Sequence, residues 1–330
     1  MKAINGLVSI IIPTFNRRQF LCECIDSVLK QQYNSLEIIV VDDCSQDDTV
    51  EYLAHNYKGV SVIKLSFHCG PAHSRNKGLA ASKGEYVLFL DSDVVLPNDQ
   101  IISTMVEQLK KSPFLGQIGG EIPIYLGTEN YARGVNLSFW GDSQFIICKK
   151  SDPVFSCDYL ATCNCMSRKK AIQLVGGFDP YFNFGSEDLD FGYRLMEKGF
   201  LNYVNFQTSI HHRHVPTGRY DDESFRYKYS RIRFFFKHFS TKKIITIFLK
   251  DFIFVILFYV HLIPKIIIKK IRKEKLLLSN LLGGYFILKA YLLNIFNYRA
   301  IKAARDVNFL KKEEIEKYEM KILQAGPERY

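Results

Sequence analysis

The chain has 330 residues, of which 47% are hydrophobic and 24% charged, so it is a globular protein long enough for one large domain and an appendage, and not a disordered or low-complexity chain. Its formal net charge of +10 is uneven: residues 1–225 carry 21 Lys and Arg against 26 Asp and Glu, and residues 226–330 carry 23 against 8. Regional charges of −5 and +15 indicate a basic C-terminal region that meets a polyanion, either nucleic acid or anionic lipid.

Short β-rich segments alternate with helix-period segments in the first hundred residues. Strands are expected at 8–15, 37–43, 60–65 and 85–91, and helices at 20–29, 49–57 and 72–82. This alternation predicts an α/β fold with a Rossmann-like, mostly parallel sheet and helices on both faces. Ligands of such sheets bind beyond the carboxyl ends of the strands.

Residues 116–215 are less regular. Ser167 is expected to cap a helix that runs to Gly176, and Ser186 to cap a second helix that runs to Lys198.

Polar residues follow the first two expected strands and begin the third helix. Pro13 opens the turn Pro13-Thr14-Phe15-Asn16-Arg17, where it ends the strand ladder and fixes a loop. Asp42 and Asp43 end the next strand, where a carboxylate can accept hydrogen bonds from a nucleobase or a ribose. Arg75 falls in the first turns of the helix at 72–82, where it could contact a base or a phosphate. Each feature also has an ordinary structural explanation as a turn, a helix cap or a solvated helix face.

Asp91 and Asp93 end the fourth strand, one residue apart. Packing gives no reason to set two like charges on one face of a strand end, and a bound cation relieves their repulsion. Mg²⁺ or Mn²⁺ suits one or two carboxylates together with substrate phosphate oxygens. An imidazole from the segment His211-His212-Arg213-His214 could complete the metal shell, with His212 and His214 as the two candidates.

Glu187 and Asp188 are expected in the first turn of the second middle helix. The helix dipole favours the ionised carboxylate there, and such a group can accept a proton near neutral pH. Acids in the first turn of a helix are also common without any catalytic role.

Taken in order, five segments over residues 7–215 resemble family 2 glycosyltransferases with the GT-A fold. The segments are PTFNR, VVDDCSQDDT, GPAHSRNKGLAASKGEY, LFLDSDVVL and CNCMSRKKAIQLVGGFDPYFNFGSEDLDFGYRLMEKG. The resemblance implies a nucleotide-diphosphate-sugar donor and inversion at the anomeric centre.

The same resemblance implies roles for the candidate residues. Asp188 matches the general base with Glu187 as its neighbour, and Asp93 matches the metal ligand. The donor-binding residues that it implies are Pro13, Thr14, Asn16, Asp43, Arg75 and Asp91. The sequence lacks the Gln-x-x-Arg-Trp motif of processive synthases, so transfer of a single sugar is expected rather than polymerisation.

The resemblance over residues 7–215 and the change to a basic, apolar composition from about residue 226 divide the chain into a catalytic domain and a C-terminal region. Residues 1–225 form the GT-A domain, with nucleotide-sugar binding in about 1–115 and the acceptor and base part in about 116–225. Residues 226–330 form a basic, apolar, helical region, expected to lie on a membrane because Lys and Arg clusters alternate with apolar stretches. A plain helical domain packed on the catalytic core is the alternative, and nucleic acid is not expected as a partner.

We therefore expect a metal-dependent transferase that moves one sugar onto a glycan or lipid-linked acceptor in cell-surface polysaccharide or glycolipid synthesis. The expected location is cytoplasmic, on the inner face of the membrane, because no secretory signal is found and the eight cysteines read as reduced. An oxidoreductase or NTPase on such a sheet would need a glycine-rich phosphate loop after the first strand, either G-x-G-x-x-G or G-x-x-x-x-G-K-S/T. The sequence contains neither motif. A nucleotidyltransferase-like enzyme and a catalytically inactive nucleotide-sugar-binding protein are the remaining alternatives.

Overall fold

The computed structural model describes residues 3–120, 131–152, 154–182, 185–213, 223–271 and 279–325. Its centre is an eight-stranded sheet in the order β3-β2-β1-β4-β10-β6-β11-β9. The strands are β1 (Ile4–Thr14), β2 (Leu36–Asp42), β3 (Val60–Lys64), β4 (Gly84–Leu90), β6 (Leu115–Gly119), β9 (Val154–Cys157), β10 (Asn164–Arg168) and β11 (Leu201–Asn205). The four N-terminal strands are parallel, whereas β10 is antiparallel to both of its neighbours, and the predicted mostly parallel α/β sheet is confirmed.

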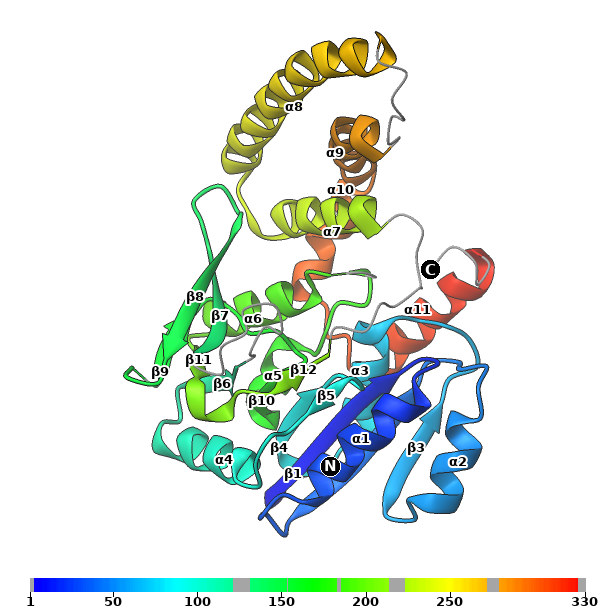
Figure 1. Cartoon of the computed structure of the whole chain (residues 1–330). Helices are drawn as coiled ribbons and strands as arrows, with labels where there is room; N and C mark the ends of the chain where they lie inside the picture. Colours follow the sequence, from blue (N-terminus) through cyan, green and yellow to red (C-terminus); the bar gives the residue numbers. More distant parts are fainter. Residues whose placement is uncertain are drawn as a thin grey trace.

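Helices cover both faces of this sheet (Figure 1). Their bounds are α1 (Arg18–Leu29), α2 (Thr49–Asn56), α3 (Pro71–Ala81), α4 (Ile101–Lys111), α5 (Lys169–Val175) and α6 (Glu187–Glu197). Strand alternation explains the two layers, because Ile10 and Ile12 of β1 pack with α1 and α4 while Ile11 packs with α3, α5 and α6. Helix α3 lies very close to β1 at Gly78, where a Cβ atom would stand 2.5 Å from the Ile11 side chain.

Two of the expected helix caps are wrong. Ser167 is a residue of β10, and α5 begins only at Lys169 after Arg168. Ser186 does precede α6, but its φ of +67° is left-handed and its hydroxyl caps no backbone N–H. A left-handed residue cannot direct its side chain as an ordinary N-cap does, because that requires an extended backbone.

Two small antiparallel pairs complete the catalytic part. One joins β5 (Val94–Val95) to β12 (His211–His212), and the other joins β7 (Tyr131–Leu137) to β8 (Ser143–Lys149). The C-terminal helices are α7 (Glu223–His238), α8 (Thr241–Ile271), α9 (Ser279–Phe296), α10 (Tyr298–Ala303) and α11 (Lys312–Ala325).

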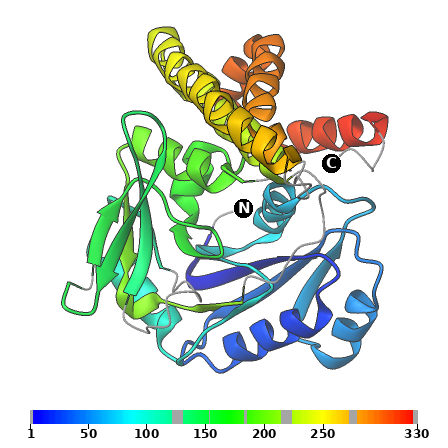
Figure 2. The same ribbon diagram turned by 45° about the horizontal axis from the view of Figure 1, so that its top comes forward.

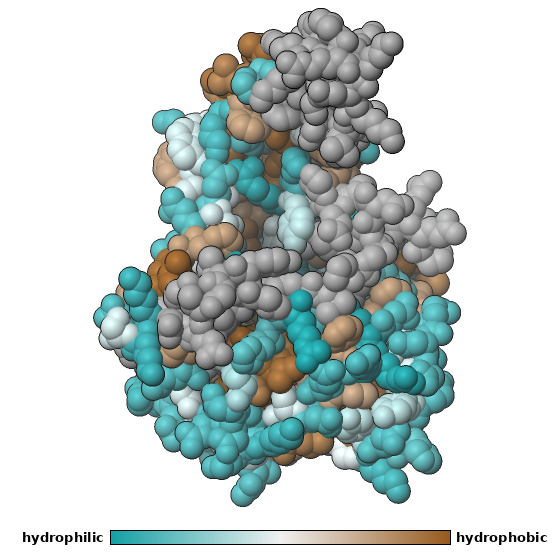
Figure 3. Space-filling model, viewed as in Figure 1, coloured by the Kyte–Doolittle hydropathy of each residue, from teal (hydrophilic) through white to brown (hydrophobic). Residues whose placement is uncertain are grey.

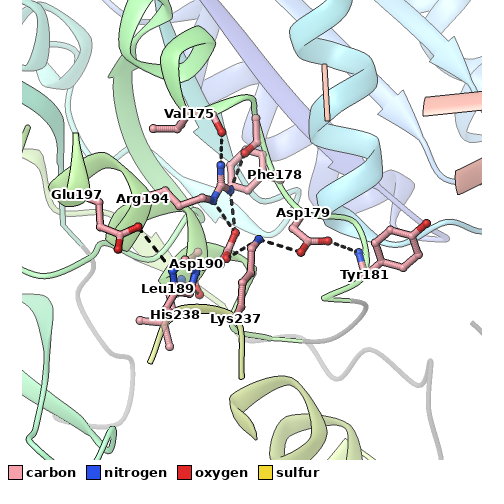
Figure 4. A network of polar contacts seen from close by, with 12 residues as sticks. Val175, Phe178, Asp179, Tyr181, Leu189, Asp190, Arg194, Glu197, Lys237 and His238 are labelled. Carbon is pink, nitrogen blue, oxygen red and sulfur yellow. Dashed lines mark hydrogen bonds and ion pairs between the residues drawn. The ribbon is translucent and has the colours of Figure 1, made fainter. Parts of the chain in front are cut away.

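Helix α7 is bound to the catalytic part by a buried ion network (Figure 4). The Lys237 ammonium lies 2.9 Å from Asp179 and 2.8 Å from Asp190, and all three side chains are fully buried. His238 contacts Asp190 at 2.8 Å, and Arg194 contacts it at the same distance. Burial alone would raise the pKa of Asp190, but the charges of Arg194 and Lys237 hold it well below its usual range.

Helix α11 returns to the catalytic part beside α3. Glu319 receives an ion pair from Lys77 at 2.8 Å and a contact from His73 at 3.2 Å. The Tyr318 hydroxyl donates to the Cys69 carbonyl at 3.1 Å. The division at residue 225 stays a prediction, and the C-terminal helices contact the rest of the chain at both α7 and α11.

Helices α8 and α9 extend away from the catalytic part (Figures 1 and 2). The segment Thr241–His261 of α8 is long and apolar enough to cross a membrane by length and composition. About a quarter of its most apolar part is buried inside the protein. From the sequence, Lys250 and Asp251 interrupt this segment and leave an uncharged stretch too short to span.

The Lys237 network gives the first test. Lys237→Met removes the cation between two buried carboxylates, so we expect a loss of about 3–5 kcal/mol in the free energy of unfolding measured with urea. Lys312→Met is the matched control, since Lys312 is 88% exposed and pairs with Glu316 at 3.5 Å on the surface. The control is expected to cost less than about 1 kcal/mol, and an equal loss in both variants would contradict the role of Lys237.

Candidate active site

The candidate site lies at the carboxyl edge of β1, β2 and β4. Thr14 ends β1 and pairs in register with Asp42 at the end of β2. The Asp43 amide donates to the Thr14 carbonyl at 2.8 Å, so the two strand ends continue side by side into their loops. The expectation that Pro13 ends the strand is wrong, because β1 continues to Thr14, which pairs with Asp42. The predicted donor-binding residues at the ends of β1 and β2 still share one edge of the sheet.

Asp43 and Asn16 hold these loops in shape. The Asp43 carboxylate, 2% exposed, accepts hydrogen bonds from the amides of Cys69 at 2.7 Å and Gly70 at 2.9 Å. Asn16, with a φ of +51°, accepts from the Gln46 amide at 2.7 Å. Both side chains thus position backbone at the start of α3 and α2, and their contact with a nucleotide stays a prediction.

Arg75 connects the two halves of the site. Its guanidinium, 3% exposed, donates to Asp91 at 2.9 Å and to Glu187 at 3.1 Å. Asp91 follows β4, and Glu187, 112 positions after Arg75, begins α6. One buried cation therefore joins the end of the fourth strand to the start of α6. The structure therefore brings Arg75, Asp91 and Glu187 together, as side chains that fix one another's positions.

Asp91, Asp93 and His212 form a cluster suited to a divalent cation. One ligand atom from each lies within 4.8 Å of the others, and His212 Nε2 is 3.3 Å from Asp93 Oδ1. The register of β12 with β5 explains this, because His212 pairs with Val94, directly after Asp93. Two carboxylates and one imidazole fit Mn²⁺ or Mg²⁺ when substrate oxygens supply the remaining ligands. His214 lies outside the described residues.

The sequence interpretation missed Arg17 as a site residue. Its guanidinium lies 2.8 Å from Asp93 Oδ2, so it places a second cation beside the acidic cluster. Arg17 stands in the PTFNR segment directly after Asn16, and its place at the strand's carboxyl end was the available signal. The distance of 76 residues to Asp93 hides the pairing from any local pattern.

Asp188 stands in the first turn of α6 beside Glu187. Its Oδ1 accepts from the Leu189 amide at 2.7 Å. Desolvation of the carboxyl, followed by the negative charge of Glu187, raises the pKa of Asp188 to about 7. The preceding residues Gly185 and Ser186 both have left-handed backbones, and they set the direction in which the helix starts. A carboxyl with this pKa can take up a proton near neutral pH.

The sequence profile described as Glycosyl transferase family 2 matches residues 9–174, half of the chain. The chain therefore belongs to glycosyl transferase family 2. Three similar proteins are the glycosyltransferase GlyG of Streptococcus pneumoniae, the putative teichuronic acid biosynthesis glycosyltransferase TuaG of Bacillus subtilis, and a Campylobacter jejuni GalNAc(5)-diNAcBac-PP-undecaprenol beta-1,3-glucosyltransferase.

These three relatives are 33%, 37% and 38% identical over 112, 109 and 106 residues. The aligned parts cover 33%, 32% and 31% of this chain, and 36%, 43% and 33% of the relatives. The match thus spans less than half of each relative's length.

Two solved structures share the fold over almost the whole chain. The mannosyltransferase PcManGT of Pyrobaculum calidifontis, solved with GDP-Man and Mn²⁺, is 16% identical, with a TM-score of 0.54 over 96% of this chain and 87% of that one. Residues 1–349 of S. aureus TarS, solved with UDP, are 17% identical, with a TM-score of 0.54 over 97% and 92%. At these identities the similarity supports the fold, with its helical C-terminal region.

The pKa of Asp188 can be tested directly. Glu187→Gln removes the neighbouring negative charge, so the pKa of Asp188 should fall from about 7. Carboxyl-carbon NMR titration of aspartate-labelled protein measures this shift. The matched control is Glu51→Gln, which changes an exposed carboxylate on α2. An unchanged titration in Glu187→Gln would show that Glu187 does not act on Asp188.

Proposed function

We propose that the chain transfers one sugar, with inversion, from a nucleotide-diphosphate sugar to a hydroxyl group of a glycan or lipid-linked acceptor. The observation that carries the proposal is that Arg75 connects two features of the site. One is the Asp91–Asp93–His212 cluster suited to a divalent cation, and the other is the start of α6 with Asp188, whose pKa is raised. The relatives support the same chemistry for cell-surface polysaccharide or glycolipid synthesis, and one of their names specifies a PP-undecaprenol-linked acceptor.

The donor's diphosphate is proposed to lie beside Asp91, Asp93 and His212. These residues would hold Mn²⁺ or Mg²⁺, which neutralises the charge that develops on the leaving diphosphate. Asp93, 4% exposed, contacts Arg17 through Oδ2, while its Oδ1 lies 3.3 Å from His212 Nε2. The nucleotide then extends toward the loops after Pro13–Thr14 and Asp43, beyond the carboxyl ends of β1 and β2.

Asp188 is proposed to be the general base. Its ionised carboxylate takes the proton from the acceptor hydroxyl as that oxygen attacks the anomeric carbon and the nucleoside diphosphate leaves. Glu187 and Arg75 position it, because Glu187 is held by Arg75, which is held in turn by Asp91. The geometry thus links the base to the residue proposed to lie near the donor sugar.

The location of the reaction is proposed to be the cytoplasmic face of a membrane. A C-terminal region with 23 Lys and Arg against 8 Asp and Glu favours an anionic surface. Part of this charge is used internally, since Arg233 and Lys237 pair with Asp179 in buried contacts.

The base assignment predicts the pH dependence of turnover. Asp188 acts in its ionised form, so kcat/KM should rise with pH up to about 7 and then level off. Asp188→Asn should lower kcat by about 10²–10⁴-fold and leave donor affinity unchanged. Asp48→Asn, at an exposed carboxylate paired with Arg18, is the control. Wild-type turnover in Asp188→Asn, measured by release of nucleoside diphosphate, would reject the assignment.

The metal assignment makes a separate prediction. In the presence of a nucleoside diphosphate, Asp93→Ala should abolish Mn²⁺ binding, and His212→Ala should weaken it by at least about 10–100-fold, the range measured for loss of an outer-shell partner of a metal ligand. Electron paramagnetic resonance of Mn²⁺ measures the bound fraction. Glu51→Ala, an exposed carboxylate on α2, should bind as the wild type does. Full binding by Asp93→Ala would remove Asp93 from the metal site.

A further inference from the structure

One face of α8 carries large apolar side chains that the described residues do not cover. Its members recur at helical spacing, and their exposed fractions run from 41% to 62%. We call these residues the α8 stripe: Ile245, Leu249, Phe252, Ile253, Ile256, Leu257 and Val260. Phe254, 56% exposed, lies on another side of the helix. From Ile245 to Val260 the stripe is about 22 Å long at 1.5 Å per residue. Figure 3 shows hydrophobic surface on the upper part of the molecule, where Figure 1 places α8.

The tip of the β7–β8 hairpin lies at one side of the stripe, beside Lys243 and Lys250. Phe139 and Trp140 are 66% and 40% exposed, and their rings meet edge to face at 5.1 Å. The Lys243 ammonium of α8 lies 5.6 Å from the Phe139 ring, and that of Lys250 lies 5.7 Å from the Trp140 ring. The hairpin and α8, about a hundred residues apart in the sequence, therefore bring exposed aromatic side chains and lysines close together.

Another face of α8, with Ile244, Ile247, Asp251 and Val255, is packed on the protein, and Lys250 lies at the border between this face and the stripe. Asp251, in the middle of the helix, is 6% exposed and accepts from the Tyr291 hydroxyl of α9 at 2.9 Å. Lys250 forms an ion pair with Asp142 of the hairpin at 2.6 Å, and Arg231 of α7 contacts the same carboxylate at 2.6 Å. A hairpin of the catalytic part thus contacts the midpoint of α8. In a spanning helix this midpoint, with its charged contact to the hairpin, would lie at the bilayer centre, where such groups are costly, so the contact favours a position in the interface.

We propose that the α8 stripe and the Phe139–Trp140 tip form one surface that lies in the interface of an anionic bilayer, with α8 parallel to the membrane. Lysines precede and follow the stripe in the sequence: Lys242 and Lys243 stand before it, and Lys265, Lys269 and Lys270 come after it. An apolar face flanked by lysines, with a tryptophan beside it, fits the boundary between acyl chains and anionic headgroups. The charge of the C-terminal region, +15, matches this partner rather than a second copy of the same region.

This surface rests on the membrane location proposed above, whereas it does not depend on the proposed transfer reaction. Helix α7 connects the two, because Lys237 holds Asp190 in the first turn of α6 while Arg231 contacts Asp251 of α8. A lipid-linked acceptor would then be presented on the same rigid support that carries Asp188.

The experiment uses the full chain and vesicles of phosphatidylcholine with or without phosphatidylglycerol. The protein should co-sediment with the anionic vesicles, and the binding should weaken as salt is raised. Leu249→Glu/Ile253→Glu/Ile256→Glu should lower the partition coefficient by about tenfold or more, since three apolar side chains leave the interface. The charge-matched control is Phe114→Glu/Leu174→Glu/Leu323→Glu, which changes three residues of 56–66% exposure outside this surface.

Trp140 is the single tryptophan of the chain, so its fluorescence reports on the hairpin tip alone. Its emission should shift to the blue on vesicle binding and be quenched by brominated lipid. Alkaline carbonate should release the bound protein, as for a peripheral protein. Equal binding by the stripe variant and its control, an unshifted Trp140 emission, or resistance to carbonate would each overturn the proposal.

Two further measurements separate other outcomes. Nucleoside diphosphate binding, measured by thermal shift, should be unchanged in the stripe variant, so a failure of the membrane surface is distinct from a failure of the donor site. Light scattering of the free protein should give a monomer. A dimer that the stripe variant dissociates would assign the surface to a second copy of the chain and overturn the membrane proposal.

Discussion

The buried guanidinium of Arg75 is the interaction on which the site depends. It lies between Asp91, which follows the fourth strand, and Glu187, which begins α6, and so fixes the donor edge of the sheet relative to the acceptor side. Removing one partner of such a buried ion pair leaves an uncompensated charge, which strongly disfavours any movement of the two halves apart. Gly78, three residues later, brings the same helix against Ile11 of the central strand. The position of Asp188 follows from this arrangement.

The sheet and most of the site could be predicted from the sequence for a physical reason. Strands buried on both faces are nearly continuous in Val, Ile and Leu, and the carboxyl ends of parallel strands share one edge. Acids that follow such a strand must therefore lie at this edge, as Asp91 and Asp93 do after β4, where His212 joins them. The choice of His212 was not available from the sequence, because it depends on the register of β12 against Val94.

Contacts between distant segments were not predictable in the same way. The basic residues of α7 suggested a surface for a polyanion, yet Lys237 and Arg233 are buried against Asp179, more than fifty residues earlier. A lysine that contacts lipid and a lysine that neutralises a buried carboxylate can stand in the same kind of local sequence, between aromatic and aliphatic residues. Arg17 beside Asp93 is a second case. The apolar character of α8 was evident, but its orientation follows only from the pairing of Asp251 and Lys250 with other elements.

The central claim is that the cluster at the end of the fourth strand binds a cation that holds the donor's diphosphate. Anomalous diffraction at the manganese edge, from crystals soaked with Mn²⁺ and UDP or GDP, tests it most directly. The account predicts an anomalous peak within coordination distance of Asp93 and His212, with diphosphate oxygens in the remaining positions. A nucleotide bound at another face of the sheet, or a manganese ion held without any contact to Asp93, would contradict the account.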